Sequence, residues 1–119
     1  MIRYDTQPGS PVIEITVEGT ITNQELEETI NNLQAEFDQN DKSRVIEIIQ
    51  HFTGMEIAAL WTDIRLGVPL AQKIDRVAVV ADQKWIRQLA GIGHLFTRAE
   101  LKVFAPSELA QARAWIAAD

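Results

Sequence analysis

Few residues of this sequence could do chemistry, and their spacing forms no catalytic constellation. His51 and His94 are the two histidines, and neither has a second strong ligand at metal-binding spacing. A general base needs a nucleophile and an orienting carboxylate within reach, and no spacing in the sequence selects either one. The chain has no cysteine, which excludes disulfides, thiolate metal sites and thiol catalysis. We therefore predict a protein that is not an enzyme and has no bound metal or cofactor.

A hydroxyl and a glycine, Thr53 and Gly54, follow an apolar run at residues 44–49. We expect a strand over that run and a helix from Glu56, which would place Thr53 and Gly54 in the turn between them. Free backbone N–H groups at a helix start favour an anion or a phosphate. Thr53 and Gly54 are therefore candidates for an anion-binding or phosphorylation site. The alternative interpretation is a helix-entry turn in which the threonine hydroxyl serves only as a cap.

Two glycines, Gly91 and Gly93, lie between a predicted helix and the last predicted strand. They lack the third glycine of a dinucleotide-binding motif and do not follow a strand, so a cofactor site is not predicted. Two interpretations of the nearby apolar residues stay open. They form a closed core, or they line an apolar ligand site whose cover is the glycine-containing turn. The residues of this predicted ligand site are Leu60, Trp61, Ile64, Trp85, Leu89, Leu95 and Phe96.

Apolar residues in alternating or continuous runs predict the strands that position these groups. A short strand is expected at residues 2–5, and the Pro- and Gly-rich segment 7–11 is typical of a turn. Val or Ile occupies every second position from 13 to 17, which indicates a strand with one more polar face. Three later runs complete the predicted strands: 44–49, 77–81 and 101–104.

About four helices are expected between and after these strands. Thr22 with Glu25 three positions later is a capping box, and it predicts a helix over residues 22–39. A second helix is expected over residues 56–73, a third from Lys84, and a closing helix capped by Ser107.

This alternation of strands and helices predicts the fold class. Strands separated by helices require crossover connections, so the sheet should be mainly parallel. We predict an α/β fold with a mainly parallel five-stranded sheet, an antiparallel N-terminal edge strand and flanking helices, formed by residues 1–119 as a single domain.

Composition restricts the partners. Seventeen acidic and eleven basic residues give a formal charge of −6, which opposes binding to nucleic acid or to an anionic membrane. The first ten residues are polar, and no apolar run is long enough to span a bilayer, so we predict a cytoplasmic protein without a transmembrane segment. The sequence is also compatible with a homodimer, because an apolar face left uncovered by a small domain needs a partner.

Blocks of sequence along the whole chain carry a resemblance to a known family. These blocks lie at residues 52–56, 60–63, 76–85, 100–104 and 112–116. With them the sequence resembles the STAS-type fold of anti-sigma-factor antagonists, and more closely the bacterial SpoIIAA-like family, which shares its fold with lipid-binding Sec14 domains.

This resemblance implies a binding or regulatory module that acts through a protein partner or an apolar small molecule. The alternative that it implies is a small carrier of a lipid or hydrophobic ligand, of the Sec14-like type. Anti-sigma-factor antagonists carry a phosphorylated serine in an Asp-Ser pair after the second parallel strand. In this sequence the corresponding residues are 50–55, where Thr53 is the one hydroxyl and no aspartate precedes it.

Overall fold

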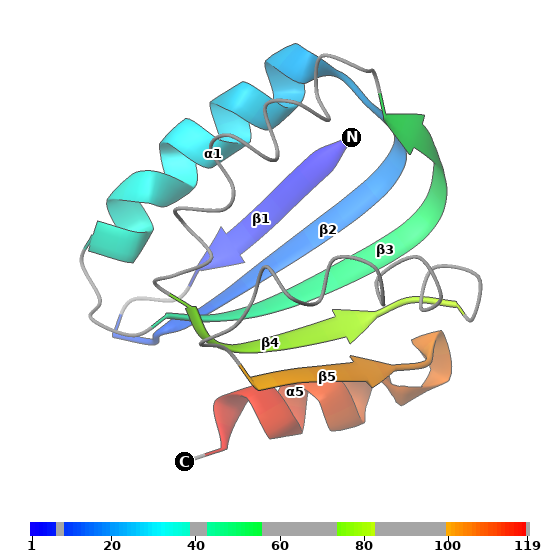
Figure 1. Ribbon diagram of the computed structural model, residues 1–119. Helices are drawn as coiled ribbons and strands as arrows, with labels where there is room; N and C mark the ends of the chain where they lie inside the picture. Colours follow the sequence, from blue (N-terminus) through cyan, green and yellow to red (C-terminus); the bar gives the residue numbers. More distant parts are fainter. Residues whose placement is uncertain (7–8, 39–42, 56–73, 83–99, 119) are drawn as a thin grey trace.

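A five-stranded sheet forms the centre of the molecule (Figure 1). The computed structural model describes residues 1–6, 9–38, 43–55, 74–82 and 100–118. The strands lie across the sheet in the order of the sequence, with β1 and β5 at its two edges. Their bounds are β1 (Ile2–Thr6), β2 (Val12–Ile21), β3 (Ser43–Met55), β4 (Ile74–Val80) and β5 (Glu100–Phe104).

The directions of the strands confirm the predicted fold class. β1 pairs with β2 in antiparallel orientation, after a turn in which Gly9 adopts the left-handed φ of 80° that glycine takes without a steric cost. The other three pairs of neighbouring strands are parallel. Parallel neighbours need a crossover connection, and α1 (Asn23–Asp38) lies in the crossover from β2 to β3. The predicted edge position of the first strand is confirmed.

Helix α1 begins at the predicted capping box. The hydroxyl of Thr22 accepts a hydrogen bond from the backbone N–H of Glu25 at 3.2 Å, and the Glu25 carboxylate accepts one from the N–H of Thr22 at 3.4 Å. Leu26, Ile30 and Leu33 follow at helical spacing and are buried against one face of the sheet. The helix predicted over residues 22–39 is confirmed to within one residue at each end.

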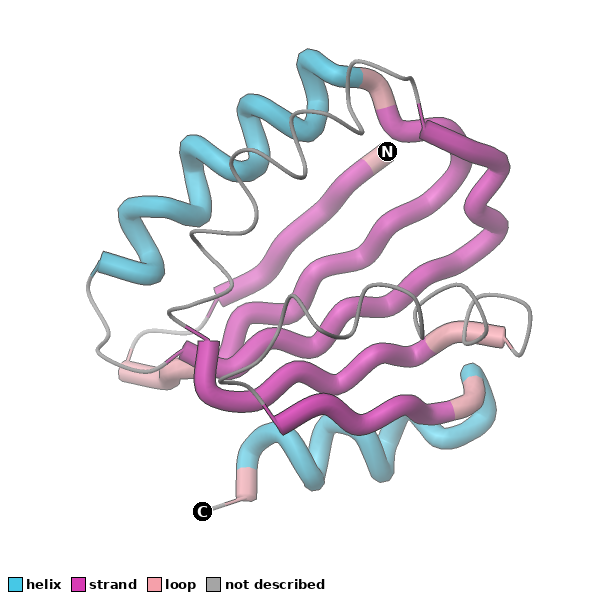
Figure 2. The backbone as a smooth tube through the Cα atoms, viewed as in Figure 1, coloured by secondary structure: helices cyan, strands magenta, loops and turns pink. Residues whose placement is uncertain are grey.

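Helix α5 (Leu109–Ala117) packs on the opposite face of the sheet, across β3, β4 and β5 (Figure 2). A 3₁₀ turn, η3 (Pro106–Glu108), precedes it. The prediction that Ser107 caps this helix is wrong, because Ser107 lies inside the 3₁₀ turn. The Glu108 carboxylate instead accepts a hydrogen bond from the N–H of Ala105 at 2.8 Å, which holds the start of the turn.

Strand β4 separates two hydrophobic cores. Val77 and Val79 face the core beneath α1, whereas Ala78 and Val80 face the core beneath α5. No residue from 77 to 81 is more than 3% exposed, which confirms the prediction of a buried central strand. A strand that is apolar on both faces is expected at the centre of a sheet that is covered on both sides.

Two of the four predicted helices, α1 and α5, lie among the described residues. The helices predicted over residues 56–73 and from Lys84 fall outside them. Within the described ranges, no helix is long and apolar enough to cross a membrane.

Candidate functional site

A cavity of about 390 Å³ lies at the end of β4, beside the last part of the parallel strand β3. Ligands of open α/β sheets bind outside the carboxyl ends of the strands, which makes this position the first candidate for a site. We call it the carboxyl-end cavity. Among the described residues its lining comes from the last part of β3, the end of β4, and the start of η3 and α5. The lining residues are Ile48, Ile49, Gln50, His51, Val80, Asp82, Pro106 and Leu109.

Strand β3 is irregular beside this cavity. Its pairing with β2 skips His51 and then Thr53, so each of these residues forms a bulge. His51 has a φ of 44°, and Gly19 on the neighbouring strand has a φ of 71°. Glycine adopts this left-handed conformation freely, whereas a residue with a side chain pays about 1–3 kcal/mol for it. His51 is also exposed, so a strained backbone position carries a solvent-accessible imidazole at the rim of the cavity.

The lining divides into an apolar floor and a polar rim. Ile48 and Val80 are buried and belong to the core beneath α5. Gln50, His51 and Asp82 are exposed and present an amide, an imidazole and a carboxylate. This arrangement suits the recognition of a group with one apolar and one polar part. Among the described residues, no three His, Asp or Glu side chains come close enough together to hold a metal ion.

The predicted anion or phosphorylation site, Thr53 and Gly54, is not in a strand-to-helix turn. β3 continues to Met55, because its backbone pairs with β2 as far as Ile21. The polar residues that follow position 49 therefore stay in the strand, and the turn predicted from them is wrong. Thr53 lies two positions after His51 on the same strand end. Its role in binding an anion or accepting a phosphate stays a prediction.

The other residues predicted from the sequence fall outside the described part of the chain. His94, Gly91 and Gly93 lie there, and so do all seven residues of the predicted apolar ligand site. That site stays a prediction: Leu60, Trp61, Ile64, Trp85, Leu89, Leu95 and Phe96.

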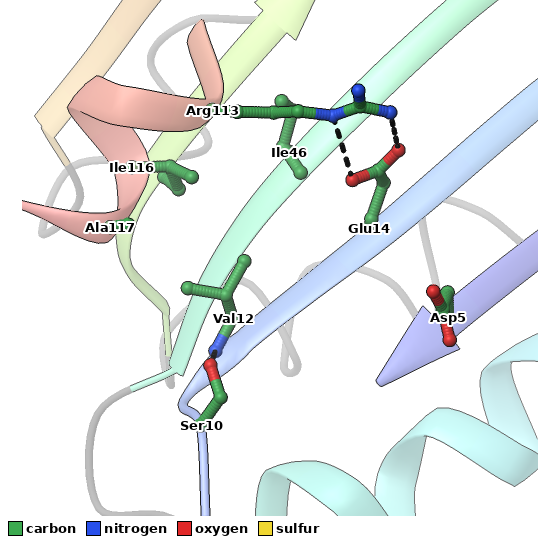
Figure 3. Close-up of a pocket in the computed structure, with 8 residues that line it drawn as sticks. All are labelled: Asp5, Ser10, Val12, Glu14, Ile46, Arg113, Ile116 and Ala117. Carbon is green, nitrogen blue, oxygen red and sulfur yellow. Dashed lines mark hydrogen bonds and ion pairs between the residues drawn. The ribbon is translucent and has the colours of Figure 1, made fainter. Parts of the chain in front are cut away.

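A second cavity, also of about 390 Å³, lies on the α5 side of the sheet (Figure 3). Arg113 of α5 extends toward β2 and donates two hydrogen bonds to the Glu14 carboxylate, from Nε at 3.3 Å and from Nη2 at 2.7 Å. The hydrogen bond and the negative charge of Glu14 raise the pKa of Arg113 above its ordinary value. We call this cavity the α5–β2 groove; its lining is Asp5, Ser10, Val12, Glu14, Ile46, Arg113, Ile116 and Ala117.

Two arginines hold the end of α5 beside this groove. Nη1 of Arg44 donates to the carbonyl oxygens of Ile116 at 3.1 Å and Ala118 at 2.5 Å. Nη1 of Arg76 donates to the same Ala118 oxygen at 2.6 Å and to that of Trp115 at 3.4 Å. The Arg76 guanidinium also lies 5.6 Å from the centre of the Trp115 ring. Cationic donors at a helix C-terminus satisfy the last carbonyls and oppose the helix dipole, so the helix end is fixed to the sheet.

The family model described as SpoIIAA-like matches residues 12–117. This chain belongs to the SpoIIAA-like family. The match runs from the first residue of β2 to the last residue of α5, and it confirms the family predicted from the sequence blocks. No curated protein sequence matches the chain.

Solved structures share the fold of this SpoIIAA-like chain. A crystal structure of an uncharacterized DUF3478-family protein with a SpoIIAA-like fold, from Shewanella loihica PV-4, is 19% identical and has a TM-score of 0.76. The similarity covers 98% of this chain and 92% of that one. The Bacillus cell fate determinant SpoIIAA in its phosphorylated form is 10% identical, has a TM-score of 0.61, and is similar over 96% of this chain and 99% of its own.

The anti-sigma factor antagonist SpoIIAA in its unphosphorylated form is 13% identical to this chain, with a TM-score of 0.62. The similarity covers 97% of this chain and 98% of that one. At sequence identities this low, the structural similarity establishes a common fold alone.

Proposed function

We propose that this SpoIIAA-like chain is a single-domain, cytoplasmic regulatory module without enzymatic activity, and that it binds a protein partner at the carboxyl-end cavity. The observation that carries the proposal is the exposed, left-handed His51 on the rim of that cavity. Backbone strain persists only where the surrounding structure holds it, and such residues concentrate at ligand-binding and switch regions.

The position and chemistry of the rim support this proposal. Gln50, His51 and Asp82 combine hydrogen-bond donors and acceptors around an apolar floor, which is the composition of a pocket that receives one side chain of a partner. The chain has a formal charge of −6, so long-range attraction favours a partner with basic residues near the contact. The descriptions of SpoIIAA as an anti-sigma factor antagonist and a cell fate determinant support a regulatory role for a chain of this fold.

Thr53 and Gly54 are the part of the site that we propose for regulation. A phosphate on Thr53 would add a charge of about −1.5 to −2 two positions from His51, and so would change the electrostatics of the rim. SpoIIAA, which has a similar fold, is known in phosphorylated and unphosphorylated forms. Phosphorylation of Thr53 would then alter partner binding without any catalytic step by this chain.

A carrier of a lipid or other hydrophobic small molecule is the second candidate function. The floor formed by Ile48, Val80 and Leu109 is apolar, and about 390 Å³ lies within the range of small-molecule sites. The two candidates differ in what stays bound to the protein after purification.

Native mass spectrometry of the protein purified from its own host tests the proposal. We would compare the wild type with a His51→Ala, Gln50→Ala double variant and with Gln34→Ala, a matched control on the exposed face of α1. The expected result is one protein partner that binds the purified wild type and Gln34→Ala equally, and binds the double variant at least about tenfold more weakly, as for loss of a contact worth more than 1 kcal/mol.

Two other results would overturn the proposal. A bound acyl-chain molecule in place of a protein would replace it with the carrier function. Equal binding of a partner to the double variant and to the wild type would remove the carboxyl-end cavity as the site.

A further inference from the structure

The edge strand β1 offers a row of backbone groups whose direction can be assigned. The N–H of Glu18 donates a hydrogen bond to the carbonyl oxygen of Met1 at 2.8 Å, and the amino group of Met1 donates one to the carbonyl oxygen of Glu18. Hydrogen-bonded and non-hydrogen-bonded pairs alternate along an antiparallel ladder. Arg3 and Asp5 therefore bond toward β2, through their pairs with Thr16 and Glu14.

The intervening residues of β1 direct their backbone groups away from β2. These residues are Ile2, Tyr4 and Thr6, and their N–H and C=O groups line the outer edge of the sheet. No described residue pairs with this edge. An unpaired strand edge is a template for a further strand.

The residues of β1 are complementary to a second, antiparallel copy of β1. A two-fold axis between two Tyr4 residues places Ile2 opposite Thr6 of the second copy, and Arg3 opposite its Asp5. In this register the outward groups of Ile2, Tyr4 and Thr6 all meet outward groups. The Arg3 and Asp5 side chains meet as non-hydrogen-bonded pairs, in which side chains approach most closely.

The neighbouring registers are disfavoured by charge. A shift that keeps the outward groups in line places either Arg3 opposite Arg3 or Asp5 opposite Asp5, and like charges directly opposite each other are destabilising. The centred register is therefore the one that uses all five residues of the strand and joins opposite charges twice. Self-complementarity about a two-fold axis is the requirement for a closed dimer interface.

Among the described residues, exposure and packing leave this surface of β1 accessible to a partner. Arg3, Tyr4 and Asp5 are all exposed, and Tyr4, at 41%, is one of three exposed large hydrophobic residues in the part of the chain that the structure describes. Helix α5 packs over β3, β4 and β5 and reaches β2 through Arg113; Asp5 lies at the border of the α5–β2 groove and stays exposed. The contact that Arg3 already makes, to the Glu18 carboxylate at 3.5 Å, is exposed and weak, so it competes little with a new ion pair.

We propose that a second copy of this chain binds along β1, in the antiparallel register centred on Tyr4. The two five-stranded sheets then form one continuous sheet of ten strands. Two Arg3–Asp5 ion pairs lie on the α5 side, and the two Tyr4 rings meet on the α1 side. This surface lies on an edge strand away from the carboxyl-end cavity, so the dimer does not depend on the function proposed for that cavity.

Charge exchange tests the dimer and its register together. Arg3→Asp leaves acidic residues at both charged positions of β1, and Asp5→Arg leaves basic residues at both. Sedimentation equilibrium should show the 13.4 kDa wild-type chain associating to twice its mass, and the dimer dissociation constant of each single variant should be at least roughly tenfold higher. An equimolar mixture of the two single variants should form a heterodimer, because both cross-strand pairs are then attractive. The variant with both exchanges should dimerise like the wild type.

Amide hydrogen exchange measured by NMR locates the interface independently. The amides of Tyr4 and Thr6 should gain protection as the wild-type concentration rises, whereas those of Arg3 and Asp5 are already bonded to β2 and should change little. Thermal unfolding of each single variant controls for loss of fold. Formation of the heterodimer in the mixture shows that both variants are folded and able to dimerise.

Three results would overturn the proposal. The first is a wild-type chain that stays monomeric at millimolar concentration. The second is a dimer whose stability ignores all four charge combinations, because it uses another surface. The third is protection of the Tyr4 and Thr6 amides only when an extended segment of another protein is added.

Discussion

Replacement of Arg44 and Arg76 by methionine tests how strongly the end of α5 is held. Methionine keeps an unbranched stem of similar reach beside Trp115 and removes the charged donors. A hydrogen bond from a charged group contributes about 1.5–3 kcal/mol net, and a cation at a helix C-terminus about 0.3–1 kcal/mol. Arg76 also forms an ion pair with Glu100, with 3.8 Å between Nε and Oε2. The Arg76 side chain is 21% exposed and that of Glu100 is 69% exposed, so the ion pair adds little stability. We expect Arg76→Met to lower the free energy of unfolding by about 1.5 kcal/mol.

The two arginines should be coupled, because both donate to the carbonyl oxygen of Ala118. Either guanidinium alone keeps that oxygen hydrogen-bonded. Removal of one also relieves the repulsion between two neighbouring cations, so each single replacement costs less than the hydrogen bonds of that arginine suggest. Both effects make the loss in the double variant larger than the sum of the two single losses. We expect the double variant to lose about 0.5–1 kcal/mol more than the sum of the two single variants.

Urea unfolding followed by far-ultraviolet circular dichroism measures these differences. Arg113→Met is the control, since it removes an arginine of α5 itself that does not bond to the end of the helix, whereas Arg44 and Arg76 hold that end from β3 and β4. The Arg113 side chain is 54% exposed and that of Glu14 29%, so the control should lose no more than about 1 kcal/mol. A double variant whose loss equals or falls below the sum of the single losses would refute the shared-acceptor reasoning.

Two further predictions concern local backbone structure. Thr22→Ala removes the capping box of α1 and should cost about 1 kcal/mol in thermal unfolding, whereas Thr22→Ser should keep most of it; equal losses would contradict the cap. Gly19→Ala places a side chain at a φ of 71° and should cost about 1–2 kcal/mol in urea unfolding. Nothing lies within 4 Å of the added Cβ, so this cost is conformational, and Gly19→Asn should lose less; an unchanged stability for Gly19→Ala would refute it.

The parts of the fold that depend on local signals were predictable from the sequence. Thr22 and Glu25 define the start of α1 because the capping box is made by residues three positions apart. The apolar run at residues 77–81 identifies a buried strand because both of its faces are apolar. The alternation of strand and helix patterns gave the parallel sheet with its antiparallel edge strand.

The end of β3 and the candidate site depend on contacts that the sequence does not express. Gln50 and His51 are polar and Gly54 follows, a pattern typical of a turn, yet pairing with β2 carries the strand to Met55. The sequence shows His51 only as one of two histidines without a metal-binding or catalytic partner, whereas its left-handed conformation results from that pairing. The contact between Arg113 and Glu14 spans 99 positions, and no local pattern signals it.

The packing of α5 has a consequence for the route by which the chain folds. Its hydrogen bond from Arg44 to Ala118 joins residues 74 positions apart, and contacts of this kind must close large loops before they stabilise anything. Folding is therefore expected to be slower than that of a helical bundle of this size, with the β1–β2 hairpin and α1 able to form earlier from nearby residues. Until α5 docks, Ile46, Ala78 and Val80 remain open to solvent on one side of the sheet. Aggregation through that side should compete with refolding as the protein concentration rises.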